Sequence, residues 1–137
     1  MGNAAFNWSV RVYYEDTDSA GIVYHASYLR FLERARTEWL RKLGFELPAL
    51  TSDHQVLFTV SRMHIDYLRP AYFNDLLQVS LALTRMGGAS FVLDQSVRRA
   101  PRELICRAEV RIACVDATTL RPRPIPHAVG MELKRDC

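Results

Sequence analysis

The stretch VRVYYEDTDSAGIVYHASYLRFLERARTEWLRKLGF, residues 10–45, begins with one hydrophobic period and ends with another. Its first residues alternate apolar and polar side chains, which is the pattern of a half-buried β-strand. The apolar positions of that alternation are Val10, Val12 and Tyr14. We therefore predict a first strand that ends where the acidic residues Glu15, Asp16 and Asp18 begin.

From Tyr28 onward the apolar residues recur every three or four positions, as on one face of an α-helix. The residues of this face are Tyr28, Leu32, Ala35, Trp39 and Leu43. Ser27 occupies the place of an N-cap residue, and Gly44 stands where helices commonly end. The pattern predicts a long helix over residues 28–43.

The rest of the chain alternates like a series of strands, after a loop predicted around Pro48 and the polar segment TSDHQ. In the first of these strands the apolar residues change from even to odd positions near Ser61 and Arg62, which predicts a β-bulge. Arg69-Pro70 is expected to end that strand, because proline cannot continue a ladder inside a sheet.

Turns are predicted at Met86-Gly87-Gly88 and Pro101-Arg102, and they separate three further strands. The last strand, residues 104–114, alternates regularly, so Cys106 and Cys114 are expected to point into the core as small apolar groups. A short helix is predicted over residues 127–136, after the proline-rich segment RPRPIP.

Strands that are linked by hairpins and apolar on one face must bury that face, and the long helix is the one large partner available. We therefore predict an α+β fold, in which a five-stranded antiparallel sheet wraps around one long central helix. Residues 1–137 are expected to form a single domain. The remaining face and the edges of such a sheet favour at least a dimer.

Composition limits the ligands and the cellular compartments that are expected for this protein. The net charge is +3, and the 18 basic residues include no block of five, so nucleic acid is not an expected ligand. No apolar run approaches the ~20 residues that span a bilayer, and the start MGNAAFNWSV lacks the pattern of an export signal. Three cysteines, Cys106, Cys114 and Cys137, without C-x-x-C spacing favour a reducing cytoplasm.

The histidines are too widely spaced for a metal-binding pair, so we expect no metal. They are His25, His54, His64 and His127. No cofactor is expected either.

The acidic turn has features that a simple helix cap does not need. Asp18 lies nine residues before Ser27, too far to cap the helix directly, and Gly21 suits a sharp turn or the close approach of a ligand. Tyr24 and His25 come just before the helix, whose free N–H groups can hold a carbonyl oxygen that becomes negative. A carboxylate facing such donors can hydrolyse a reactive acyl group, and a thioester fits better than an amide.

The sequence resembles the Tol-Pal-associated acyl-CoA thioesterases, a branch of the 4-hydroxybenzoyl-CoA thioesterase-like hotdog family. The family pattern D-x-x-G-x-V-Y-H-x-x-Y is present as Asp18, Gly21, Val23, Tyr24, His25 and Tyr28. The similarity continues through MHIDYLRPA, residues 63–71, and through AEVRIACVDATTLRPRPIP in the last third. The resemblance implies the hotdog fold and hydrolysis of acyl-CoA to a free acid and CoA.

The resemblance also implies roles for individual residues. Asp18 would be the nucleophile or general base, with Tyr14 and His25 beside it, and the backbone N–H of His25 would polarise the thioester carbonyl. The other motif residues, which would bind the substrate, are Gly21, Val23, Tyr24 and Tyr28. Glu15 and Asp16 are interpreted as turn and solvent groups.

Two functions remain open at this point. The first is the thioesterase, with the CoA nucleotide near some of Arg62, Arg98, Arg99 and Arg102. The alternative is a module that binds an acyl chain or acyl carrier protein, and serves phospholipid synthesis or the Tol-Pal envelope system with little turnover. The resemblance implies homodimers that assemble into homotetramers, acyl carrier protein and phospholipid-synthesis enzymes as partners, and a cytoplasmic protein peripheral to the inner membrane.

Overall fold

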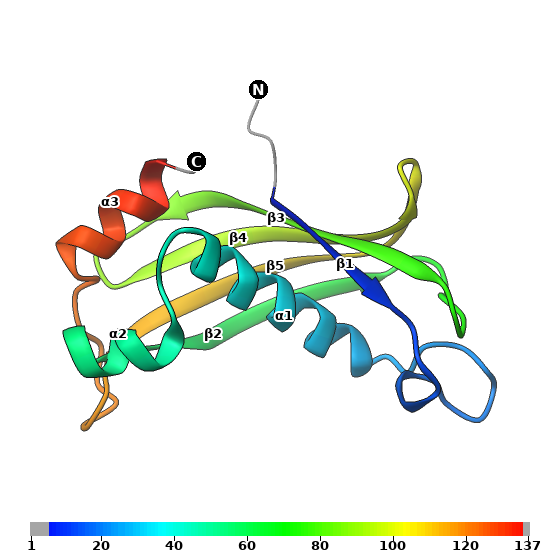
Figure 1. Ribbon diagram of the computed structural model, residues 1–137, viewed down its shortest axis with the longest axis horizontal. Helices are drawn as coiled ribbons and strands as arrows, with labels where there is room; N and C mark the ends of the chain where they lie inside the picture. Colours follow the sequence, from blue (N-terminus) through cyan, green and yellow to red (C-terminus); the bar gives the residue numbers. More distant parts are fainter. Residues whose placement is uncertain (1–5, 136–137) are drawn as a thin grey trace.

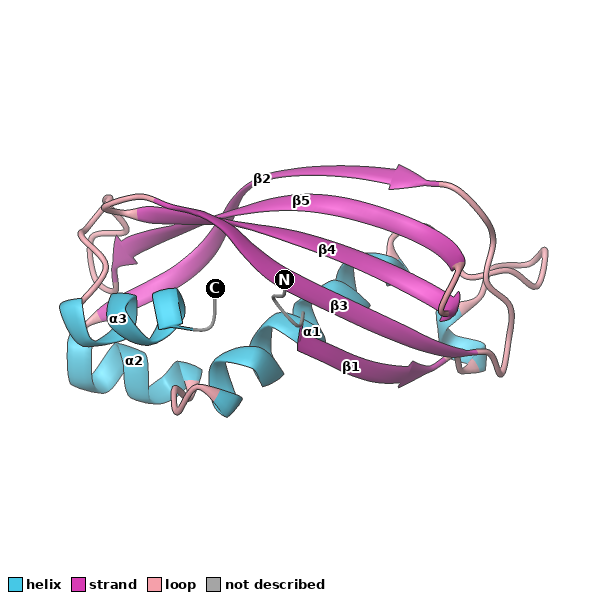
Figure 2. Ribbon diagram, turned by 90° about the horizontal axis from the view of Figure 1, so that it is seen from above, coloured by secondary structure: helices cyan, strands magenta, loops and turns pink. Residues whose placement is uncertain are grey.

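The structure is a computed structural model that describes residues 6–135. Residues 1–5, the start of the segment expected to lack an export signal, and Cys137 lie outside the described residues. Five antiparallel strands form one sheet in the order β1-β3-β4-β5-β2, and helices lie on one side of it (Figures 1 and 2). The strands are β1 (Phe6–Arg11), β2 (Val56–Tyr67), β3 (Leu76–Met86), β4 (Ser90–Ala100) and β5 (Glu103–Asp116).

The long helix α1 (Ser27–Lys42) confirms the predicted helical stretch. Gly44 ends it with φ +99°, a conformation that costs glycine little. The N-cap prediction is wrong, because Ala26 holds that position and no side chain caps the helix. The Ser27 hydroxyl instead donates to the backbone carbonyl of Asp16 at 3.0 Å, and so ties the helix to the acidic turn.

The first strand stops earlier than its alternation suggests. Strand β1 ends at Arg11, Val12 is fully buried, and Tyr14 begins a 3-10 turn, η1 (Tyr14–Asp16). Tyr14 is 77% exposed and stacks on Phe73 with ring centroids 4.0 Å apart. The prediction that Tyr14 points inward at the end of a strand is therefore wrong, since the chain turns before reaching it.

The loop predicted around Pro48 is a second helix, α2 (Leu47–His54). Pro48 lies in the first helical turn, where proline has no hydrogen bond to lose. The buried side chain of Leu50 anchors this short helix, and Gln55 ends it in the left-handed region with φ 58°. With α3 (His127–Arg135), which was predicted, the described residues contain three helices, so the expectation of a single long helix is too simple.

The turns and the bulge of the sheet follow the sequence pattern. The β2–β5 register shifts between Val60 and Arg62, which confirms the predicted bulge. A second shift, between Leu83 and Arg85 in the β3–β4 pair, was not predicted. The hairpin turns at Gly87-Gly88 and Pro101-Arg102 lie between strands, as predicted.

The core lies between α1 and the sheet, and it includes Cys106 as predicted; Cys114 is likewise buried. Burial raises the pKa of the Cys106 thiol to about 12 from an ordinary value of 9.0. The folded protein therefore keeps this thiol neutral at a pH where the unfolded chain ionises it.

Because the pKa of Cys106 is raised in the folded state, its contribution to stability is complete below about pH 9 and is lost as the pH rises toward about 12. We expect the free energy of unfolding to fall over this range, by at most about 1.4 kcal/mol per pH unit for one thiol. Urea denaturation at a series of pH values measures the slope. Cys106→Ala should make the slope shallower, and an unchanged slope would contradict this interpretation.

Candidate active site

The turn that carries Asp18 is held by its own backbone. The Asp18 N–H donates to the carbonyl of Ile22 at 2.9 Å, and the Gly21 N–H donates to the carbonyl of Asp18 at 3.0 Å. Isolated bridges pair Thr17 with Val23 and Ile22 with Tyr72. The Asp18 carboxylate accepts the Ala20 N–H through Oδ1 at 2.8 Å. These bonds fix the direction of the carboxylate.

Gly21 closes this turn with φ +83°, in the left-handed region. Apart from its chain neighbours, no atom of residues 6–135 lies within 4 Å of the position a Cβ would take there, so a substitution meets backbone strain and no steric clash. We expect Gly21→Ala to lower the free energy of unfolding by about 1–2 kcal/mol, measured by urea denaturation. Gly88→Ala is the matched control, because Gly88 has equal space and no positive φ. Equal losses in both variants would refute the role of the turn conformation.

An open cleft of about 320 Å³ lies beside this turn. Its walls come from the turn, the start of α1 and the segment that follows β2. They are Asp18, Ile22, Val23, His25, Tyr28, Tyr67, Leu68, Arg69 and Pro70. The structure therefore brings together four of the residues predicted from the motif, namely Asp18, Val23, His25 and Tyr28. Asp18 is exposed to solvent at this cleft.

His25 is fixed at the cleft by contacts on both sides of its ring. Its carbonyl accepts the Tyr67 hydroxyl at 3.0 Å, and the two rings meet edge to face at 6.2 Å. The Tyr24 ring lies 4.6 Å from the imidazole on another side. The backbone N–H of His25 makes no hydrogen bond within residues 6–135. An unpaired N–H at this position, two residues before α1 begins, can donate to an oxyanion.

Two phenols border the cleft: Tyr28 is buried, whereas Tyr67 is partly exposed. The Tyr28 oxygen accepts the Ala71 N–H at 3.2 Å, and burial raises the pKa of Tyr28 to about 12. The Tyr67 ring lies 5.7 Å from that of Tyr28, and burial also raises the pKa of Tyr67. Both phenols therefore stay protonated at neutral pH and present a hydroxyl or a ring, never a negative charge.

Three residues expected at the site lie outside the lining of this cleft. Gly21 shapes the turn, Tyr24 is exposed beside His25, and Tyr14 stacks on Phe73. Conversely, Tyr67, Leu68, Arg69 and Pro70 belong to the lining and were missed as site residues. The segment MHIDYLRPA was the available signal, but it was interpreted as a strand with a terminating proline and as part of the family resemblance, without any site residue in it.

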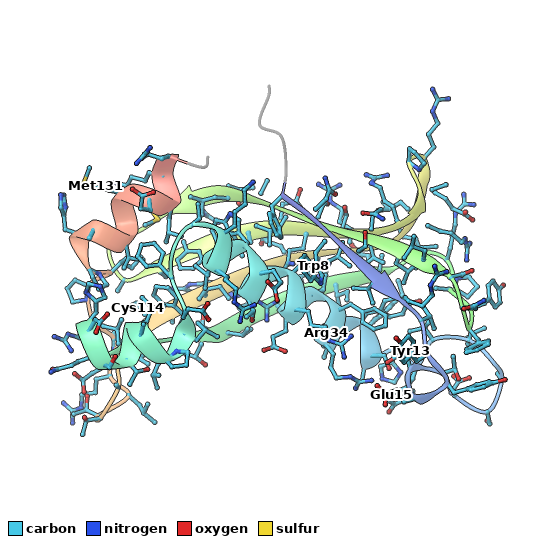
Figure 3. The ribbon with its side chains drawn as sticks, viewed as in Figure 1. Trp8, Tyr13, Glu15, Arg34, Cys114 and Met131 are labelled. Atoms are coloured by element: carbon cyan, nitrogen blue, oxygen red, sulfur yellow. The ribbon has the colours of Figure 1, made fainter. Side chains whose placement is uncertain are left out.

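Asp16 is buried, and its interpretation as a solvent group is wrong. It is 2% exposed, accepts the Tyr13 N–H at 2.9 Å, and lies 3.5 Å from Arg30. Its backbone carbonyl also accepts the Tyr24 N–H at 2.9 Å. Asp16 thus connects the acidic turn to the start of α1. Glu15 is exposed and borders a different hollow, together with Trp8, Tyr13 and Arg34 (Figure 3).

Arg99, one of four arginines considered for the CoA nucleotide, is already paired. Its guanidinium bonds to Asp75 at 2.9 Å and to Glu103, and these hydrogen bonds raise its pKa. It also lies over the Tyr72 ring, 5.6 Å from the centroid. We therefore assign Arg99 to the framework around the cleft.

No cluster of three metal-binding side chains occurs in residues 6–135. In the same part of the chain, no helix has both the length and the hydropathy needed to cross a membrane.

Comparison with known proteins agrees with this geometry. A family model described as the thioesterase-like superfamily matches residues 12–133. This chain belongs to that superfamily. It is 44% identical to the acyl-CoA thioester hydrolase YbgC of Escherichia coli O157:H7 over 135 residues. The match covers 98% of this chain and 100% of the relative. This chain is also 43% identical to the acyl-CoA thioesterase YbgC of Haemophilus influenzae over 129 residues, or 94% of each chain.

A solved structure supports the same family and fold. The crystal structure of a probable thioesterase from Bartonella henselae superimposes with a TM-score of 0.85 at 36% identity, and the match covers 90% of this chain and 100% of that one. The fold is therefore the hotdog-type fold of thioesterases, with the five-stranded antiparallel sheet that the sequence pattern predicts.

Proposed function

We propose that this protein hydrolyses acyl-CoA thioesters to a free acid and CoA, with Asp18 as the reactive carboxylate. One observation carries the proposal: Asp18 lines the same open cleft as His25, whose backbone N–H has no partner within residues 6–135. Membership of the thioesterase-like superfamily, and relatives named as acyl-CoA thioester hydrolases, support the reaction class.

The two oxygens of the Asp18 carboxylate differ in their surroundings. Oδ1 accepts the Ala20 N–H, whereas Oδ2 accepts no hydrogen bond from any donor in residues 6–135. Oδ2 is therefore the oxygen available for chemistry. It either attacks the thioester carbonyl carbon, forming an anhydride that water then cleaves, or removes a proton from an attacking water. In both routes the C–S bond breaks, and the CoA sulfur leaves as a thiolate that takes up a proton.

His25 completes the site from the opposite side of the thioester. As the carbonyl carbon becomes tetrahedral, its oxygen gains negative charge, and the His25 N–H donates to it beside the positive end of the α1 dipole. Val23 and Tyr28 form the apolar wall next to the acyl group, while Gly21 and Tyr24 shape the approach. Tyr14 remains a proposed site residue, by resemblance, that would act from beyond the cleft lining.

A panel of acyl-CoAs with short, long and aromatic acyl groups, assayed by release of free thiol, tests the proposed reaction and its chain-length preference. Thiol release with at least one class of substrate is the expected result. If no substrate is hydrolysed while acyl-CoA still binds, the binding-module alternative replaces the enzyme.

We further propose that the chain forms homodimers that assemble into homotetramers. Strand β2 is an edge of the sheet, and it exposes Val60 and Tyr67, which a second copy would cover. A solution mass measurement tests this directly. The resemblance extends the proposal to acyl carrier protein and phospholipid-synthesis enzymes as partners, to a link with the Tol-Pal system, and to a cytoplasmic location at the inner membrane.

A further inference from the structure

Three arginines lie in one row across the sheet, far along the chain from the acidic turn. In the strand register Arg62 of β2 is opposite Arg111 of β5, Arg111 is opposite Val92 of β4, and Val92 is opposite Arg85 of β3. We call Arg62, Arg85 and Arg111 the arginine row. The β3–β4 turn beside it lies at the opposite end of the sheet from the acidic turn (Figure 1).

Two β-bulges create this row. Without them Arg62 and Arg85 would continue the inward-facing positions of their strands, which end at Val60 and Leu83. Each register shift adds one residue and turns the arginine to the other face. Arg111 reaches that face by ordinary alternation, since Val110 and Ile112 on either side of it are buried in the core. All three guanidinium groups therefore lie on the face turned away from α1.

The two bulges are built in the same way. The extra residue is Ser61 in β2 and Thr84 in β3, and both carry a hydroxyl. Ser61 donates to the carbonyl of Arg111 at 3.3 Å, and Thr84 donates to the carbonyl of Val92 at 3.1 Å. Each hydroxyl thus bonds to the backbone of the residue opposite an arginine of the row, Arg111 opposite Arg62 and Val92 opposite Arg85, and so stabilises the bulge that positions that arginine.

The row is electrostatically unfavourable in isolation. Like charges directly opposite on neighbouring strands repel, and Arg62 and Arg111 are such a pair. None of the three forms an ion pair within residues 6–135. By contrast Arg107, four residues before Arg111 on β5, forms an ion pair with Asp94 at 3.4 Å. Glu109, the outward neighbour of Arg111, makes no ion pair with it in the described chain. A bound anion would remove this repulsion.

The row borders a hollow that is large enough for such an anion. Its volume is about 300 Å³, and its other walls are Met86, Gly87, Ser90, Phe91 and Val92. Guanidinium groups bind phosphate oxygens in pairs of parallel hydrogen bonds, and they do so better than lysine. We propose that the arginine row is a binding site for a phosphate-bearing ligand, separate from the acidic cleft.

The test uses pyrophosphate as the probe and the full-length protein at low ionic strength. Calorimetric titration should show pyrophosphate binding, and thermal melts should show a rise of the midpoint with pyrophosphate concentration. Arg111→Gln should weaken the binding at least about tenfold, because one charged partner is lost. Arg107→Gln is the matched control: it removes the same charge from the same strand and face, and it should leave binding unchanged.

A second readout comes from the unliganded protein. Arg111→Gln relieves the repulsion from Arg62, so its melting midpoint should exceed that of Arg107→Gln at low salt, and the difference should shrink as salt screens the charges. Absence of pyrophosphate binding, or equal binding by Arg111→Gln and the parent protein, overturns the proposal. Because neither measurement involves thioester hydrolysis, its outcome is independent of the proposed enzyme activity.

Vesicles identify the source of the phosphate. Binding to phosphatidylglycerol vesicles, with none to phosphatidylcholine and loss in Arg111→Gln, assigns a lipid headgroup. Binding to pyrophosphate without binding to either vesicle assigns a soluble phosphate-bearing metabolite.

Discussion

Asp18→Asn is expected to lower kcat for acyl-CoA hydrolysis at least about 100-fold, because asparagine keeps the shape of the side chain but can neither attack a carbonyl nor take a proton. Folding should persist, since the amide oxygen can still accept the Ala20 N–H that holds Oδ1. The measurement is thiol release under saturating substrate, with acyl-CoA affinity determined separately by titration. A loss of kcat with affinity retained assigns Asp18 to the chemical step.

Glu15→Gln provides the control for charge. Glu15 belongs to the same acidic segment, is exposed, and lines a different hollow from Asp18, so removing its charge should change kcat little. If Asp18→Asn and Glu15→Gln both keep the parent turnover, the Asp18 carboxylate has no part in the reaction, and hydrolysis must depend on another group.

Trp39→Ala is expected to produce the largest loss of stability, about 3–5 kcal/mol of unfolding free energy. Trp39 is almost fully buried in α1, and its ring lies 6.3 Å from that of Phe91 in β4. It also borders an open pocket of about 100 Å³ between the helix and the sheet, so truncation would leave still fewer packing contacts there. Urea denaturation, with the midpoint and slope both fitted, measures the loss.

Trp8→Ala is the matched control for this substitution. Trp8 lies on the edge strand β1 and is 38% exposed (Figure 3), so the same chemical change should cost no more than about 1 kcal/mol. Similar losses for the two tryptophans would mean that the helix–sheet interface is not the main source of stability.

The elements that sequence predicts well are those with a strong period. Helix α1 repeats its apolar face over 16 residues, and the β2 bulge appears as a change of phase around Ser61. Helix α2 is missed because it is short, lacks an amphipathic period, and is held by the burial of one residue, Leu50. The strand end before Tyr14 is missed because local alternation continues beyond the last residue paired with β3.

The site divides in a similar way. The motif identifies Asp18 and His25, which are close in sequence and line one cleft. Tyr67 and Arg69 reach that cleft from the far end of β2, and this depends on the β2–β5 register, which sequence spacing does not contain. The burial of Asp16 also has no local signal, because it arises where the turn packs on Arg30 and on the start of α1.

The arginine row could not be predicted from the sequence pattern. The sequence shows many arginines without a basic block, and Arg62, Arg85 and Arg111 are too far apart to suggest a common site. Only the cross-strand register brings them together, and the bulge that turns Arg85 outward leaves no clear trace in the pattern of β3. Sites formed by one residue from each of several strands are therefore visible only in the folded sheet.

The most direct test of the reaction geometry is a crystal structure of Asp18→Asn with an uncleaved acyl-CoA. We expect the thioester carbonyl carbon within about 3.5 Å of the substituted side chain, and its oxygen within about 3.1 Å of the His25 backbone nitrogen. An acyl-CoA whose carbonyl lies elsewhere, with its oxygen directed away from the start of α1, would contradict the proposed mechanism.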